Sequence, residues 1–162
     1  MSTRGKEKAT RAYRRILWPT DFSRLAKAAL PHAERLAASS GAELVVLHVL
    51  PLPAIYAFPE VSGAVWDQIE RENHVIGKRK LRRITEQLKG KTPKLRVHSI
   101  LAEGVAFDYI LRVAKRLRCD LIVLATHGRT GLRHVLMGSV AENVVRRAPC
   151  PVLTVRPPRF TR

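Results

Sequence analysis

LIVLATHGRTG, residues 121–131, is the most informative stretch of this 162-residue chain. Its first part, Leu121–Leu124, is apolar throughout and too short for a helix, so it predicts a strand that is buried on both faces. The loop that follows contains Gly128 and Gly131. A second turn then begins a helix, and Ser139 is its expected N-cap because a serine hydroxyl accepts backbone hydrogen bonds at that position.

A strand, a glycine loop and the beginning of a helix together form a common phosphate-binding arrangement. Glycines let backbone N–H groups approach phosphate oxygens, and a helix N-terminus adds partial positive charge. Gly138 is therefore expected to leave space for a phosphate. The same pattern also suits an ordinary connection between a strand and a helix. The chain has no P-loop with Gly-Lys-Ser/Thr and no Gly-x-Gly-x-x-Gly.

Segments typical of strands and helices alternate along the chain, which predicts an α/β fold with one open, mostly parallel sheet of five strands and helices on both faces. The expected strands span residues 15–18, 43–50, 95–101, 121–124 and 152–155. The expected helices span residues 23–40, 61–88 and 139–147, with a further helix after Gly104. We expect a single domain at residues 13–157, between a basic, disordered tail at 1–12 and a short tail at 158–162.

Several residues modify the expected helices and strands. Pro31 should kink the first helix or delay its start, and Gly41 should end it. Gly77 interrupts the apolar stripe of the helix at 61–88. That stripe consists of Val65, Ile69, Ile76, Leu81, Ile84 and Leu88. The strand at 95–101 alternates apolar and polar residues, which indicates an edge strand with one exposed face.

The charge of the chain is unusual, because 30 lysines and arginines stand against 13 acidic residues. The basic residues cluster at 4–15 and 78–96. Such clusters attract nucleic acid or another anionic surface, so a nucleic-acid or anionic-surface binding protein is the alternative function. A solvated surface that keeps a small protein soluble is the other interpretation of these clusters.

The cysteines and the hydropathy favour a cytoplasmic protein. Cys119 and Cys150 form neither a C-x-x-C nor a metal-binding spacing, and reduced thiols are the preferred interpretation over a bridge between two neighbouring strands. The histidines show no metal spacing either. No apolar run approaches the ~20 residues of a membrane span, and the charged N-terminus is no secretory signal.

The spacing of the glycine loop resembles that of the universal stress protein family, whose pattern is Gly-x2-Gly-x9-Gly-Ser/Thr. Gly128 is followed after nine residues by Gly138-Ser139, and the likeness continues through 140–144 and 148–152. The chain departs from the pattern at Ala125, which replaces the first glycine. The resemblance covers residues 14–155.

The resemblance implies a Rossmann-like, adenine nucleotide alpha hydrolase-like fold with strand order 3-2-1-4-5. It also implies an adenine nucleotide (ATP, AMP or ADP, with Mg²⁺ held by the phosphates) between the ends of strands 1 and 4. Crevices at the carboxyl ends of strands in open α/β sheets are ligand sites. The expected nucleotide-binding residues are Pro19, Thr20, Asp21, Val49, Leu124, Ala125, His127, Gly128, Arg129, Gly138, Ser139 and Val140.

These residues have distinct expected roles. By resemblance, Asp21 lies near the ribose and adenine, Val49 contacts the base, and Gly128, Ser139 and Val140 hold phosphates. The residue types agree, since a carboxylate accepts from ribose hydroxyls and apolar side chains flank a base. Arg129 can neutralise phosphate charge, although an ordinary surface arginine is an equal alternative.

The sequence favours regulation over catalysis. It contains no Walker lysine, no paired carboxylates and no nucleophile with an adjacent base, so we assign no catalytic residue and expect at most slow ATP hydrolysis. His127 is interpreted as a pocket wall, and His48 as a core histidine. The apolar last strand needs a cover, and both this need and the resemblance predict a homodimer through Pro151–Arg156.

Overall fold

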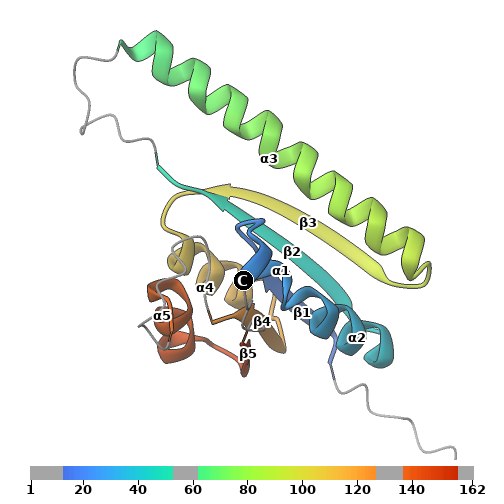
Figure 1. Cartoon of the computed structure of the whole chain (residues 1–162). Coiled ribbons are helices and arrows are strands. Elements are labelled where there is room, and N and C mark those ends of the chain that lie inside the picture. Colours follow the sequence, from blue (N-terminus) through green and yellow to red (C-terminus); the bar gives the residue numbers. More distant parts are fainter. Residues whose placement is uncertain (1–12, 53–61, 127–136, 157–162) are drawn as a thin grey trace, which may run out of the picture.

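The computed structural model describes residues 13–52, 62–126 and 137–156 as a single sheet with helices on both faces (Figure 1). The strands are β1 (Arg15–Pro19), β2 (Glu43–Leu50), β3 (Arg96–Glu103), β4 (Leu121–Ala125) and β5 (Val152–Val155). The helices are α1 (Arg24–Lys27), α2 (Leu30–Ser40), α3 (Gly63–Lys91), α4 (Ala106–Arg116) and α5 (Ser139–Arg147). The strand order is β3-β2-β1-β4-β5 and every pair is parallel, which confirms the predicted α/β fold and strand order.

The sheet separates two apolar cores. Trp18 lies in the core beneath α2 and α3, whereas Leu17, its neighbour on β1, lies in the core beneath α4 and α5. Both side chains are fully buried, as alternation along a strand covered on both faces requires. β4 is buried along its whole length, which confirms the interpretation of the 121–124 run.

The first predicted helix is divided into two. Ser23 caps α1 by accepting the N–H of Ala26 at 3.0 Å. α2 begins only at Leu30, because Pro31 fits the first turn of a helix but not its interior. The predicted late start is therefore confirmed, and Gly41 ends α2 in the left-handed conformation with a φ of 63°.

α3 is much longer than the strand it covers. Its 29 residues span about 44 Å, whereas the eight residues of β3 span about 26 Å. The first half of α3 consequently has little to pack against, and Figure 1 shows it extending past the sheet. The predicted apolar stripe is wrong there, since Val65, Ile69 and Ile76 are exposed. No helix in the described part of the chain is long and apolar enough to cross a membrane.

Gly77, which was expected to interrupt the apolar stripe, is buried within α3, and the helix runs through it without a break. A Cβ on this residue would lie 3.0 Å from Cδ1 of Leu101 and 3.7 Å from Cδ2 of His48. The absent side chain thus lets α3 approach the sheet closely. The buried side chains Leu81, Ile84 and Leu88 follow on the same helix.

Candidate functional site

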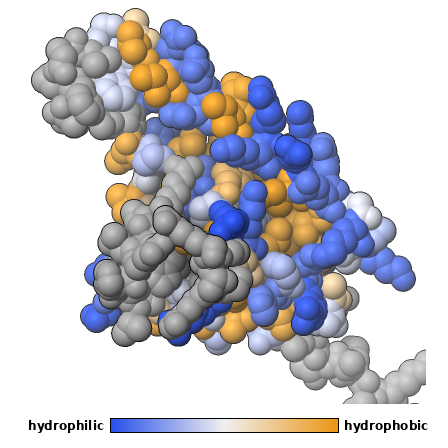
Figure 2. Space-filling view, viewed as in Figure 1, coloured by the Kyte–Doolittle hydropathy of each residue, from blue (hydrophilic) through white to orange (hydrophobic). Residues whose placement is uncertain are grey.

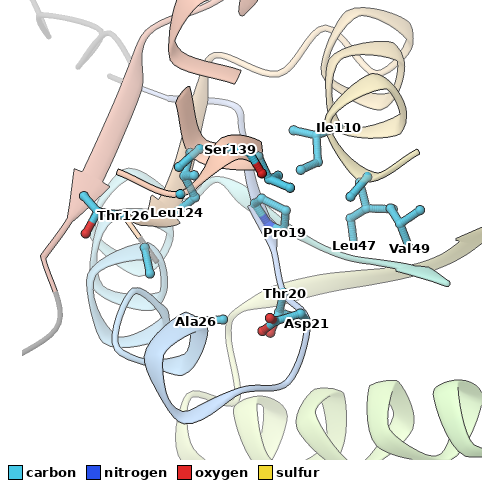
Figure 3. A pocket seen from close by; sticks show the side chains of 15 residues that line it. Pro19, Thr20, Asp21, Ala26, Leu47, Val49, Ile110, Leu124, Thr126 and Ser139 are labelled. Carbon is cyan, nitrogen blue, oxygen red and sulfur yellow. The ribbon is translucent and has the colours of Figure 1, made fainter. Parts of the chain in front are cut away.

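A pocket of about 260 Å³ lies at the carboxyl ends of β1 and β4, where the strand order reverses direction (Figure 3). Its walls come from β1 and the turn after it, from β2, from the end of β4, and from α4 and α5. They are Pro19, Thr20, Asp21, Ala26, Leu47, Val49, Ala106, Ile110, Leu124, Ala125, Thr126, Gly138, Ser139, Val140 and Ala141. This is the position at which open α/β sheets bind ligands.

The turn after β1 is fixed by short hydrogen bonds. The N–H of Thr20 donates to the carbonyl of Leu47 at 2.8 Å, which holds the turn against β2. The Thr20 hydroxyl accepts the N–H of Phe22 at 3.0 Å, and the Asp21 carboxylate accepts the N–H of Ser23 at 2.9 Å. Together these bonds present Thr20 and Asp21 on one side of the pocket, as Figure 3 shows.

His48 on β2 helps to hold this turn in place. It is buried, and its Nδ1 lies 2.8 Å from the carbonyl oxygen of Thr20. Because a carbonyl only accepts, Nδ1 must carry the hydrogen. The His48 ring packs on Phe22 with centroids 4.2 Å apart, and the Lys80 ammonium lies 5.4 Å from the Phe22 ring. Phe22 has a φ of 63°, an uncommon conformation for a bulky residue, which these contacts help to maintain.

The second polar side of the pocket is formed where β4 ends and α5 begins. The N–H of Thr126 donates to the carbonyl of Val155 on β5 at 2.9 Å. The carbonyl of Thr126 in turn accepts the N–H of Gly138 at 2.7 Å. This bond holds the beginning of α5 next to the end of β4, so that Ser139 and Leu124 line one pocket.

The predicted N-cap of α5 is wrong by one residue. Gly138 occupies that position with a φ of −69° and a ψ of 152°, and no side-chain hydrogen bond caps the helix. Ser139 is the first helical residue, so its hydroxyl is not required for capping. The physical reason is that the bond from Gly138 to Thr126 fixes the extended residue at 138 rather than at 139.

The structure brings together every predicted site residue that it describes. These residues are Pro19, Thr20, Asp21, Val49, Leu124, Ala125, Gly138, Ser139 and Val140. The predicted contributions of His127, Gly128 and Arg129 lie outside the described residues. Ala125, which replaces a glycine of the family pattern, is buried and belongs to the apolar core on the α2 side of the sheet, so its methyl group has a place within the protein.

Sequence reasoning missed part of the apolar lining of the pocket, including Leu47, Ala106 and Ile110. Leu47 lies two residues before Val49 on β2, and strand alternation alone places both side chains on one face. Ala106 and Ile110 are one helical turn apart on α4, a spacing that places them on one side of that helix. Without knowledge that α4 packs against α5 and β2, nothing in the sequence directs Ala106 and Ile110 to the pocket.

The chemistry of the pocket is that of a binding site. Its described lining has one carboxylate, Asp21, among hydroxyl and apolar groups. Across the described residues no three His, Cys, Asp or Glu side chains gather as a metal site. Both cysteines lie away from the pocket in the core on the α4 and α5 side, where burial above all, aided by nearby Cys150, raises the pKa of Cys119 to about 12.

Comparison with known proteins gives one consistent result. A model of the universal stress protein family matches residues 12–156. A universal stress protein of Methanocaldococcus jannaschii is 32% identical over 148 residues, which are 91% of this chain and 84% of that protein. UspA from Lactobacillus plantarum has a TM-score of 0.76 at 27% identity, covering 89% of this chain and 98% of that one. A universal stress protein solved in complex with cAMP has a TM-score of 0.62 at 25% identity, covering 90% and 98%. On this fold and these matches, the chain belongs to the universal stress protein family.

Proposed function

We propose that this protein binds an adenine nucleotide in the pocket between the ends of β1 and β4 and acts as a nucleotide-dependent regulatory protein. The observation that supports this most is the convergence of the Pro19–Asp21 turn and the beginning of α5 on one pocket. A family relative solved in complex with cAMP supports the class of ligand. The pocket has a volume of about 260 Å³ and is lined mainly by apolar side chains with a few polar groups, as small-molecule sites generally are.

The apolar walls of the pocket and the Asp21 carboxylate suit the base and the ribose of a nucleotide. Leu47 and Val49 from β2 and Leu124 from β4 offer apolar surface on which an adenine ring can lie. Asp21 provides a carboxylate that accepts hydrogen bonds from ribose hydroxyls. A charge-assisted hydrogen bond of this kind contributes about 1–3 kcal/mol.

The phosphates suit the beginning of α5. The backbone N–H groups of Ser139 and Val140 have no partner within the helix at its first turn, and the helix dipole adds partial positive charge. The Ser139 hydroxyl is a further donor, because it does not cap the helix. In this arrangement ATP, ADP or AMP is bound through the same groups, and a Mg²⁺ ion is held by the phosphates.

Titration calorimetry with ATP and magnesium tests the proposal. Asp21→Ala should weaken binding by about 1–3 kcal/mol. Gly138→Leu should abolish binding, because its side chain would occupy phosphate space, while its φ of −69° allows any residue. Gly90→Leu is the matched control, since a Cβ at Gly90 meets nothing within 4 Å. A folded wild-type protein that shows no binding at millimolar ATP would contradict the proposal.

The same proposal includes slow turnover at most. The described lining of the pocket contains one carboxylate, that of Asp21, and no histidine, lysine or arginine. Phosphoryl transfer depends on positioned charges and metal ligands. Hydrolysis of ATP should therefore stay well below ~1 s⁻¹, the lower range of ordinary enzymes. Phosphate release at or above that rate would show that an enzyme has been mistaken for a binding protein.

We also propose that the protein is a homodimer through Pro151–Arg156. β5 ends the sheet on its side, and Leu153 is exposed there. An exposed apolar edge strand needs a cover, and the same strand of a second copy can provide it across a two-fold axis. Light scattering should give twice the chain mass, and Leu153→Lys should shift it toward the monomer. A wild-type monomer at tens of micromolar would rule this interface out.

A further inference from the structure

The outer edge of β3 has no backbone partner among the described residues. β3 ends the sheet on the side opposite β5 and pairs with β2 alone, as Figure 1 shows. The N–H of Gly104 donates to the carbonyl of Leu50 on β2. Because backbone groups of successive residues point alternately to the two sides of a strand, those of Val97, Ser99 and Leu101 point away from β2. A row of outward N–H and C=O groups is thus available to a further strand.

Two grooves flank this edge. One, of about 550 Å³, lies between α3 and β3, and the other, of about 760 Å³, lies between β3 and α4. Leu101 lines both grooves, so β3 lies between them. A strand added beside β3 would direct alternate side chains to the two faces of the sheet. Its side chains would therefore enter the two grooves in turn.

Both grooves are basic. The groove beside α3 is lined by Lys78, Arg82 and Lys89. The groove beside α4 is lined by Arg112, Lys115 and Arg116. Figure 2 shows hydrophilic residues along α3, with apolar patches between them. An added strand would accordingly meet cations on both of its faces.

The acidic residues in the two grooves already have partners. Glu86 lies 3.8 Å from Nε of Arg82, and Glu103 lies 3.0 Å from Nε2 of His74. Arg112 is bound by Asp108 at 2.5 Å.

Four cations remain in the two grooves without a carboxylate within 4.0 Å in the described part of the chain. They are Lys78 and Lys89 beside α3, and Lys115 and Arg116 beside α4. Two available cations on each face of the edge suit a ligand with carboxylates on both of its faces.

We propose that the edge of β3 binds an extended acidic segment of a partner protein, which adds a strand to the sheet. Backbone hydrogen bonds to Val97, Ser99 and Leu101 give affinity, and carboxylates in the two basic grooves give selectivity. A second copy of this chain does not suit the surface, because pairing β3 with β3 would bring the same cations together in a protein of net charge +17.

The strand edge favours a peptide over nucleic acid. A nucleic acid would use the cations alone and has no need of outward backbone groups between them. Leu101, whose backbone groups point away from β2, lines both grooves. The two classes of partner can therefore be separated by changing the edge and the charges independently.

The direct test is fluorescence anisotropy with a labelled eight-residue peptide of repeated Glu-Glu-Val-Val, which places a carboxylate on each face of the strand. The same peptide with alternate N-methylated residues keeps its charge but loses strand hydrogen bonds on one side. Methylation on the side that faces β3 should weaken binding at least tenfold, and a Lys-Lys-Val-Val peptide should not bind. Equal binding of the methylated and parent peptides, or no binding of the acidic peptide, would overturn the proposal.

Matched variants of the protein separate the edge from the charges. Ser99→Pro removes one outward N–H and leaves the hydrogen bonds between β3 and β2 in place. It should weaken peptide binding at least tenfold, whereas Ser99→Ala should leave peptide binding unchanged. Lys115→Glu should weaken peptide binding several-fold. Lys27→Glu on α1 makes the same change of charge outside the two grooves and serves as the control. The proposal would be overturned if a single-stranded oligonucleotide bound more tightly than the peptide and its affinity were unchanged by Ser99→Pro. That result would assign the surface to nucleic acid.

Hydrogen exchange on the wild-type protein keeps the proposal testable even where a variant fails to fold. The acidic peptide should slow exchange at the amides of Val97, Ser99 and Leu101. The amides of His98 and Ile100 already donate to β2 and should change little. Equal slowing of exchange at all five of these amides, or slowing on α3 alone, would show that no strand is added.

Discussion

Replacing Gly104 with alanine should destabilise the fold by about 2–4 kcal/mol. Gly104 joins β3 to α4 with a φ of +139°, a conformation that costs a residue with a side chain about 1–3 kcal/mol. Its N–H donates to the carbonyl of Leu50 at 2.8 Å, so the backbone cannot relax without losing that bond. A Cβ would also lie 2.5 Å from Cε2 of Tyr109, and moving that ring off its rotamer adds roughly 1 kcal/mol.

Thermal unfolding followed by circular dichroism measures this effect. In a chain of this length each kcal/mol lowers Tm by about 2–4 °C, so Gly104→Ala should lower Tm by roughly 5–15 °C. Gly90→Ala is the control, because a Cβ there meets nothing within 4 Å. Alanine is favoured over glycine in helices by up to about 1 kcal/mol, so the control should keep or slightly raise Tm. A Gly104→Ala protein as stable as the wild type would refute the reasoning from φ and from Tyr109.

Three further predictions follow from buried polar groups. His48→Phe should lower the free energy of unfolding by about 1–3 kcal/mol, because the carbonyl of Thr20 loses its buried hydrogen-bond donor. Unfolding in urea measures this change. Unchanged stability would mean that this hydrogen bond contributes nothing. Burial alone would raise the pKa of Glu34, but hydrogen bonds from Lys91 and Thr92 and the Lys91 charge lower it. Because the folded pKa lies below the unfolded one, the stabilisation is present above about pH 4.5 and is lost as the pH falls through the folded pKa. Glu34→Gln should therefore flatten the acid dependence of stability, and an unaltered dependence would contradict the assignment. At pH 8 Cys119, whose pKa burial raises to about 12, should react with iodoacetamide only after unfolding, and rapid labelling of the native protein would show that the thiol is accessible.

The strands and the main residues of the pocket could be predicted because their signals are local. The apolar run at 121–124 and the alternation of strands and helices indicate a parallel α/β sheet from hydropathy alone. The strand order came from the family resemblance, since one sequence does not contain it. The resemblance also brought Asp21 and Ser139 to one site, over a sequence separation that no local pattern spans.

The remaining features depend on long-range contacts. The N-cap of α5 is Gly138 because its N–H bonds to Thr126, twelve residues earlier. A glycine suits position 77 of α3 because Leu101 and His48 lie close to the space that a side chain would occupy. Ile110 reaches the pocket because α4 packs beside α5. In each case the deciding neighbour belongs to another element, so local propensity could not identify it.

The most direct test of the proposed function is a crystal structure of the wild-type protein grown with ATP and magnesium. The proposal predicts density for the nucleotide between the ends of β1 and β4. The base should lie on Val49 and Leu124, the ribose within hydrogen-bond distance of Asp21, and the phosphates at the N–H groups of Ser139 and Val140. A nucleotide bound elsewhere on the molecule, for example along the basic surface of α3, with this pocket filled only by solvent, would contradict it.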